Sequence, residues 1–289
     1  MKSHSKDTGA KSFRSGFLDL PSGRLTYIDE GEGTPVVIVH GTPLWPTHYR
    51  PLLNKLSSQH RCIAIEAFVP TQTGEPADWT YNPKTHAYLV EQLLAHLQLQ
   101  DIHMLLHDAG TPAGLAYAIQ HAGNIRSLML LNTSSCSFTK SARQAGAGNR
   151  PVLHLGKLLY ARLHAFRPTL VKKLASSLEA ADAAAQTPSK RVLPEARELA
   201  EITAWYNEQW QKRSAIQNIA TLLLWGEYDK LSAMKSLQKW KQFFHECYVI
   251  HLDNSTYSIE GGGMDDISDY LNNFMVEERK KRETMPLSS

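Results

Sequence analysis

Residues 102–119 read IHMLLHDAGTPAGLAYAI and have the pattern of a strand, a tight turn and a helix. This stretch opens with an apolar run that has the length of a buried strand, and residues 112–119 have the character of a helix. Residues 107–110 join the two as a tight turn with Asp108 at its tip. Such a turn exposes the tip side chain above the sheet, and small residues such as Ala109 let the strand and helix pack closely. The pattern predicts an α/β protein that displays a carboxylate at a strand end.

Short apolar runs of this kind recur along the chain, with helical patterns between them. Strands buried on both faces of a parallel sheet have this continuous apolar character. The predicted strands are residues 36–39, 62–65, 102–106, 128–131, 222–225 and 248–252. Asn82 and Pro83 predict the start of one helix, because an asparagine cap and a first-turn proline favour initiation, and another is predicted after Met264. We therefore expect a mostly parallel central sheet flanked by helices.

The rhythm of strands stops between residues 135 and 218, where alanine-, leucine- and lysine-rich sequence has helical character. We expect residues 135–218 to form a helical cap, inserted into a core that residues 12–134 and 219–277 build together. Residues 1–11 and 278–289 lack periodicity and carry mixed charge, so disordered tails are expected there.

The composition favours a small organic ligand. With 289 residues and 42% apolar content, the chain can bury a sizeable core. Its 31 basic and 28 acidic residues nearly balance, which argues against nucleic acid or an anionic membrane as the partner. The three cysteines are an odd, widely spaced set, and this argues for a reducing compartment. The polar start of the chain predicts neither a signal peptide nor a membrane span, so a cytoplasmic location is expected.

The histidines form no cluster with metal-ligand spacing, so neither a metal nor another cofactor is expected. His86 precedes Val90 by one turn on the same helical face, which suggests a packing or capping role. Trp205 and Trp210 either line a pocket beneath the cap or pack in the core. The oligomeric state is left open.

Two further motifs strengthen the interpretation of the turn at Asp108. Residues 40–45, HGTPLW, follow an apolar strand, and Tyr49 and Arg50 come soon after. Residues 222–229, LLLWGEYD, form an apolar strand that ends in Gly-x-x-Asp. In this order the motifs resemble those of the α/β-hydrolase fold, closest to the haloalkane dehalogenases and epoxide hydrolases. The resemblance extends over about residues 16–275.

The resemblance implies an active site in which Asp108 is the nucleophile and Asp229 is the acid of a catalytic triad. It also implies that the backbone amides of Thr42 and Ala109 form an oxyanion site. The side chains expected to line the substrate pocket are His40, Trp45 and His107.

The sequence departs from this family at the third member of the triad. The family places a histidine after the strand that ends at Leu252, and alignment without a gap back from Ile267 puts Tyr257 at that position. No histidine follows His251, which lies inside a predicted strand and is expected to be too far back to reach Asp108. The triad is therefore predicted to be degenerate.

Other positions differ as well. Ala109 stands where the family has a halide-cradling tryptophan, and Thr42 stands where it has an asparagine, so halide stabilisation is not expected. Residues 66–70, EAFVP, replace an aspartate and a glycine-rich loop.

Loss of the histidine removes the base that activates water to hydrolyse an aspartyl ester. A tyrosine, with a solution pKa of about 10, is a poor base near neutral pH but can donate a proton or hydrogen bond. The sequence thus favours an enzyme in which Asp108 acts as a base or positions the substrate and Tyr257 is a donor. Elimination, decarboxylation, rearrangement or cyclisation of a small organic molecule would suit these groups.

Two alternatives remain open. One is a catalytically silent small-molecule receptor or protein-interaction pseudoenzyme, in which Asp108 and Asp229 are relics held by hydrogen bonds. The other is a weak ester, epoxide or carbon–halogen hydrolase that uses a displaced base.

Overall fold

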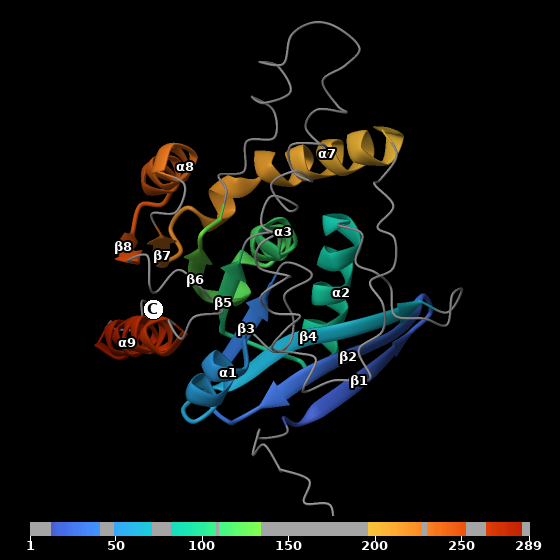
Figure 1. The fold of residues 1–289 in the computed structure, drawn as a ribbon, viewed down its shortest axis with the longest axis horizontal. Coiled ribbons are helices and arrows are strands. Elements are labelled where there is room, and N and C mark those ends of the chain that lie inside the picture. The colour runs from blue at the N-terminus through green and yellow to red at the C-terminus, as the bar shows by residue number, and fades with distance from the viewer. Residues whose placement is uncertain are drawn as a thin grey trace, which may run out of the picture.

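The computed structural model confirms the α/β fold. It describes residues 13–40, 49–70, 82–107, 110–133, 196–226, 230–252 and 264–284. The strands in these ranges are β1 (Ser15–Leu20), β2 (Gly23–Glu30), β3 (Pro35–Val39), β4 (Arg61–Pro70), β5 (Ile102–His107), β6 (Ile125–Leu131), β7 (Thr221–Gly226) and β8 (Cys247–Leu252). They form one sheet in the order β1-β2-β4-β3-β5-β6-β7-β8 (Figure 1).

The sheet is parallel except at one edge. β4, β3, β5, β6, β7 and β8 pair in parallel, which confirms the predicted arrangement of all six predicted strands. β1 pairs antiparallel with β2, and β2 pairs antiparallel with β4. The sequence analysis did not predict β1 and β2. Alternate residues of β1 are exposed, so this edge strand lacks the continuous apolar run of a strand buried on both faces.

β4 is longer than the sequence indicated. Residues 66–70, which take the place of a loop in the family pattern, continue the strand as far as Pro70. Antiparallel pairing with β2 extends it, and Pro70 lies opposite Gly23. β3 pairs with β4 only as far as Ala64, so Pro70 lies where β4 has become an edge strand, and a proline is tolerated there.

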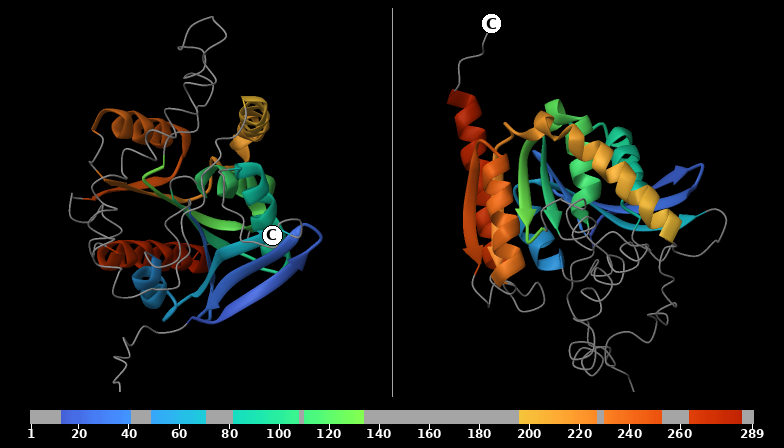
Figure 2. Two further views of the ribbon diagram at one scale, coloured as in Figure 1. Left: turned by 45° about the vertical axis from the view of Figure 1, so that its right-hand side comes forward. Right: turned by 90° about the horizontal axis from the view of Figure 1, so that it is seen from above.

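Helices cover both faces of the sheet (Figures 1 and 2). Those described are α1 (Arg50–Leu56), α2 (Pro83–His96), α3 (Thr111–Gln120), α7 (Ala196–Gln211), α8 (Lys230–Phe243) and α9 (Met264–Thr284). α1 and α9 lie together on one face, and α2, α3 and α8 lie on the other. α7 crosses over α2 and α3 and contacts both.

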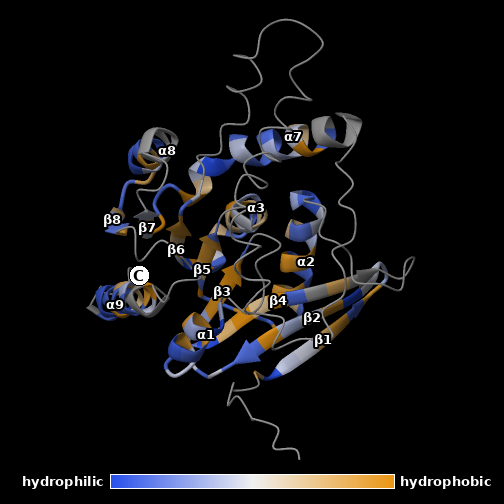
Figure 3. Ribbon diagram, viewed as in Figure 1, coloured by the Kyte–Doolittle hydropathy of each residue, from blue (hydrophilic) through white to orange (hydrophobic). Residues whose placement is uncertain are grey.

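Each face of the sheet has its own apolar core, and the central strands between them are hydrophobic (Figure 3). β5 is buried along its whole length and sends alternate side chains to opposite faces. Leu106 packs in the cluster beneath α2, α3 and α8, whereas Leu105 packs in the cluster beneath α1 and α9. Each fully buried aliphatic side chain contributes about 1.5–3 kcal/mol to folding, so these two clusters hold the strand ends in place.

α2 begins where the sequence predicted. The side-chain oxygen of Asn82 accepts hydrogen bonds from the backbone N–H groups of Lys84 at 3.1 Å and Thr85 at 3.2 Å. Pro83 occupies the first turn, where its missing N–H leaves no helical hydrogen bond unmade. The predicted cap and first-turn proline are confirmed.

α9 extends beyond the predicted start of the C-terminal tail at residue 278 and ends at Thr284. The mixed charges of this segment pair with one another. Lys281 donates to Glu278 at 2.8 Å, and Arg279 donates to Glu283 at 2.8 Å. Pairs three and four residues apart support a helix, so the prediction of a disordered tail is wrong for residues 278–284. Residues 285–289 and the tail predicted for residues 1–11 lie outside the described ranges.

The structure describes residues 196–218 of the segment predicted to form a cap. These residues contain α7 and a short 3₁₀ helix, Arg213–Ile216. The remainder of residues 135–218 lies outside the described part of the chain, so the domain boundaries stay predictions.

Candidate active site

β3 and β5 end side by side at the centre of the sheet. Val39, the last residue of β3, pairs with Leu106 of β5 in parallel register. His40 follows β3 and His107 closes β5, and their side chains are buried, with 6% and 8% of their surface exposed. In open α/β sheets, ligands bind beyond the carboxyl ends of such strands. Two of the three predicted pocket residues, His40 and His107, therefore lie at the expected end of the sheet.

A hydrogen bond links Tyr49 to His107 beneath this end of the sheet. The Tyr49 hydroxyl meets the Nδ1 atom of His107, and the two ring centroids are 6.0 Å apart at an angle of 67°. Tyr49 precedes α1 and is fully buried. In the sequence, Tyr49 is only part of a motif, and it was not predicted to belong to the site.

Tyr49 also contacts His40. Their ring centroids are 5.5 Å apart. The Nε2 atom of His40 is 3.1 Å from the backbone carbonyl oxygen of Ile65 on β4. A carbonyl oxygen only accepts, so Nε2 of His40 carries the hydrogen and donates it. This hydrogen bond connects the end of β3 to β4 through the side chain of His40.

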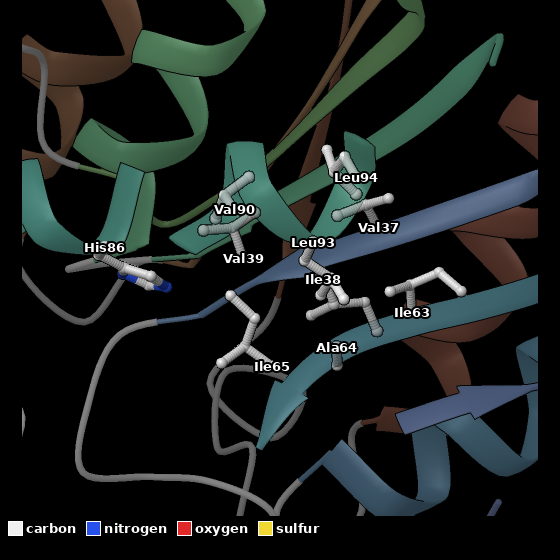
Figure 4. Close-up of a pocket in the computed structure, with 10 residues that line it drawn as sticks. All are labelled: Val37, Ile38, Val39, Ile63, Ala64, Ile65, His86, Val90, Leu93 and Leu94. Atoms are coloured by element: carbon white, nitrogen blue, oxygen red, sulfur yellow. The ribbon is translucent and has the colours of Figure 1, made fainter. Parts of the chain in front are cut away.

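His86 is a third histidine near these strand ends. Burial, and to a smaller extent the neighbouring His40, lowers its pKa to about 3, so the imidazole is neutral near pH 7. His86 and Val90 line one small cavity of about 10 Å³ between α2, β3 and β4 (Figure 4). A cavity of that size holds at most a single water. The packing role predicted for His86 is confirmed, while the cap of α2 comes from Asn82.

The helix that follows the turn presses against the end of β3. A Cβ atom on Gly110 would lie 2.5 Å from the carbonyl oxygen of Val39 and 2.6 Å from the carbonyl carbon of His40. No side chain fits at such a distance, so this close approach requires glycine. The prediction that small residues permit tight packing around the turn is confirmed at Gly110.

The remaining predicted site residues lie outside the described ranges. They are Thr42, Trp45, Asp108, Ala109, Asp229 and Tyr257. The roles assigned to them stay predictions, including the replacement of the histidine by a tyrosine.

The chain segments that carry these residues leave from the same end of the sheet. Asp108 follows His107 directly, at the carboxyl end of β5. Gly226 and Leu252 end the neighbouring parallel strands β7 and β8 and pair with each other. The segments that lead to Asp229 and Tyr257 begin at these two residues. His251 lies inside β8, as predicted, and its side chain is exposed.

Asn132 holds the carboxyl end of β7, and this contact was not predicted from the sequence. It follows β6 with a φ of 47°, a left-handed conformation that asparagine tolerates better than most residues. Its side-chain oxygen accepts a hydrogen bond of 2.7 Å from the backbone N–H of Gly226, and its own N–H donates to the carbonyl of Leu224 at 3.0 Å. Asn132 thus fixes the end of β7 three residues before Asp229. An asparagine directly after a buried strand was the available signal.

Trp210 packs as a core residue. Its ring centroid is 5.6 Å from that of Trp240 and 5.5 Å from that of Phe243, both on α8. Trp205 is partly buried against the same core. The described contacts of these tryptophans favour the packing alternative over the pocket alternative.

Within the described ranges, no three histidine, cysteine, aspartate or glutamate side chains are grouped as a metal site would require. Among the helices that the structure describes, none has the length and apolar character needed to cross a membrane.

Comparison with known proteins gives the family. Residues 34–256 match the family described as the alpha/beta hydrolase fold. The chain belongs to this family. Among solved structures, a haloalkane dehalogenase loop variant from Bradyrhizobium elkanii superposes with a TM-score of 0.59 at 14% identity, and the match covers 93% of this chain and 100% of that one. At this low identity the likeness shows the α/β-hydrolase fold alone.

Two curated relatives of this α/β-hydrolase-fold protein have different enzyme names. A cis-3-alkyl-4-alkyloxetan-2-one decarboxylase from Shewanella oneidensis is 27% identical in a gapped alignment that covers 92% of this chain and 89% of the relative. Haloalkane dehalogenase 2 from Mycobacterium tuberculosis is 31% identical over 121 residues, which cover 42% of each chain. The similarity to the decarboxylase therefore extends over nearly the whole chain.

Proposed function

We propose that this protein is an enzyme that acts on a small organic substrate by a non-hydrolytic reaction, and that the reaction is decarboxylation of an oxetan-2-one. The observation that carries the proposal is the similarity, over 92% of the chain, to a relative named for that reaction. Decarboxylation is also one of the four reactions favoured by the predicted replacement of the catalytic histidine.

The chemistry of an oxetan-2-one explains why that histidine is dispensable. The carboxylate of Asp108 attacks ring carbon 4, and the bond from that carbon to the ring oxygen breaks, so the oxygen leaves as a substrate carboxylate. The electron pair of the bond between carbons 2 and 3 then forms the double bond between carbons 3 and 4. Carbon dioxide and the Asp108 carboxylate leave together. No water, oxidant or base is consumed, and Asp108 is regenerated without ester hydrolysis.

The other predicted residues support this reaction by hydrogen bonding. The backbone amides of Thr42 and Ala109 and the hydroxyl of Tyr257 stabilise the charge that develops on the departing carboxylate. Asp229 accepts a hydrogen bond from Tyr257 and orients it. None of these roles requires Tyr257 to act as a base, which suits a phenol near neutral pH.

The test measures turnover of a cis-3,4-dialkyl oxetan-2-one by gas chromatography of the alkene. Asp108→Asn should abolish turnover because a neutral amide is a poor nucleophile. Tyr257→Phe should lower kcat by about 10² to 10³, comparable with the loss of an oxyanion donor. The matched control is Tyr270→Phe on α9, where the tyrosine is 38% exposed, and it should turn over like the unaltered chain.

The same assay decides between the proposal and its alternatives. Binding of the lactone without any product would indicate a silent receptor, and release of the 3-hydroxy acid would indicate a hydrolase. Unchanged turnover in Asp108→Asn would overturn the assignment of the nucleophile.

A further inference from the structure

We propose that Tyr49 is a positioning residue of the active site, because its hydrogen bond to His107 fixes the strand end that carries Asp108. This inference rests on the proposed role of Asp108 as a nucleophile. The inference holds for any substrate that the Asp108 carboxylate attacks, whatever reaction follows that attack.

The contact occurs where a small displacement would matter. His107 is the last residue of β5, and Asp108 is joined to it by a single peptide bond. The side chain of His107 points to the face covered by α1 and α9, where the hydroxyl of Tyr49 meets its Nδ1 atom. A shift of the His107 backbone is passed on directly to Asp108. A displacement of about 1 Å at a reacting group can slow a reaction substantially.

The surroundings make this hydrogen bond hard to replace by water. Tyr49 is fully buried among Leu52, Leu53 and Leu131, so water has poor access to its hydroxyl. A buried polar pair in apolar surroundings is costly to separate and holds its geometry tightly. Tyr49 therefore connects α1 to the end of β5 by a fixed link.

The turn is held from its other side by packing. Gly110 approaches the carbonyl groups of Val39 and His40 so closely that a Cβ atom would collide with them. The two residues between His107 and Gly110 are thus bounded by a hydrogen-bonded end and a tightly packed end. Removal of the Tyr49 hydroxyl deletes the hydrogen bond at His107 and leaves the packing around Gly110 intact.

The same strand provides a matched control. His103 lies on the same face of β5, and its Nδ1 atom is 2.7 Å from the hydroxyl of Ser127. Ser127 is also fully buried. His103 is four residues from His107, or about 13 Å along a strand. Ser127→Ala therefore removes the same kind of hydrogen bond from the same strand, but far from Asp108.

The test follows esterification of Asp108 by 1,2-epoxyhexane with intact-protein mass spectrometry. The carboxylate attacks an epoxide carbon, the ring C–O bond breaks, and the resulting alkoxide takes a proton from water. The hydroxyalkyl ester is expected to persist because the base that would hydrolyse it is predicted to be missing. Asp108→Asn corrects for reaction at other nucleophiles, and circular dichroism checks that each variant is folded.

We expect Tyr49→Phe to lower the maximal rate of esterification by about 10-fold or more, with an unchanged half-saturating epoxide concentration. Ser127→Ala should react like the unaltered chain. His107→Asn should react faster than His107→Leu, because the Asn side-chain oxygen can occupy the position of Nδ1 and meet Tyr49. His107→Leu, which has no polar atom, should react as slowly as Tyr49→Phe.

Three results would overturn the inference: an undiminished rate in Tyr49→Phe, an equal loss in Ser127→Ala, or no ester at Asp108 in the unaltered chain. The two proposals can fail separately. Slow esterification in Tyr49→Phe without any decarboxylation of the lactone would sustain the positioning role and reject the proposed reaction. Decarboxylation of the lactone, together with an unchanged esterification rate in Tyr49→Phe, would support the proposed reaction and reject the positioning role of Tyr49.

Discussion

Asn132 connects the end of β6 to the end of β7 by hydrogen bonds. Its replacement should therefore affect both the stability of the fold and the position of β7. In Asn132→Ala the backbone N–H of Gly226 loses its side-chain acceptor, and alanine is less tolerant than asparagine of the φ of 47°. We expect the free energy of unfolding to fall by about 1–3 kcal/mol, measured by urea denaturation. Turnover of the oxetan-2-one should fall as well, because β7 leads to Asp229.

A second asparagine separates these two effects. The side chain of Asn124 accepts a hydrogen bond of 3.0 Å from the N–H of Asp101 and donates one of 3.0 Å to the carbonyl of Leu99, at the other end of the sheet. Asn124→Ala should destabilise the fold similarly and leave turnover unchanged. An equal loss of turnover in both variants would mean that general instability, and not the position of β7, explains the result.

His86 should make stability depend on pH. Its pKa in the folded chain, about 3, lies below the ordinary value of 6.5. Between these values the unfolded chain binds more protons than the folded chain, so stability decreases as the pH falls through this window. His86→Gln should flatten the dependence of the unfolding free energy on pH, measured in urea between about pH 6.5 and 5, above the range of ordinary carboxylates.

The flattening should be partial. Burial also lowers the pKa of His60, which therefore contributes a dependence of the same sign in His86→Gln. An unchanged slope in His86→Gln would show that His86 is as easily protonated in the folded chain as in the unfolded one.

At the scale of elements, the residue that precedes α3, Gly110, lies very close to the end of β3. Gly110→Ala would bring a Cβ atom within 2.5 Å of the Val39 carbonyl oxygen, so the helix or the strand must move. Overpacking of this kind costs about 1–3 kcal/mol, and we expect a corresponding loss in the unfolding free energy by urea denaturation. Gly123→Ala is the control, because nothing lies within 4 Å of the added atom. Equal stability of the two variants would contradict the described packing.

The positions of β5 and β7 could be predicted from the sequence, and those of β1 and the last turns of α9 could not. β5 and β7 are buried throughout, so their apolar runs stand out. β1 is half exposed, and it forms because β2 offers it a hydrogen-bonding edge. The last turns of α9 depend in part on contacts of Lys281 with Glu246, which is distant in the sequence. β1 and the end of α9 were not predicted because each forms with partners that lie elsewhere in the sequence.

At the scale of the whole molecule, the order of the motifs indicated the family and the end of the sheet where the site lies. It did not indicate the contacts that hold that end together. Tyr49 and His107 are 58 positions apart, and Asn132 and Gly226 are 94 positions apart. Neither pair has a local sequence signal, because each forms only when separate strands and helices are assembled. The family can thus be predicted from motifs, whereas these two hydrogen bonds could be identified only from the structure.

Decarboxylation and hydrolysis are distinguished by the ratio of alkene to 3-hydroxy acid formed from one cis-3,4-dialkyl oxetan-2-one, determined by mass spectrometry. We expect alkene and carbon dioxide from the unaltered chain, because Asp108 is regenerated without water. Tyr257→His should shift the products toward the 3-hydroxy acid, because a histidine at this position supplies the base for hydrolysis. The proposed decarboxylation would be contradicted if the unaltered chain formed mainly hydroxy acid and Tyr257→His left the ratio unchanged.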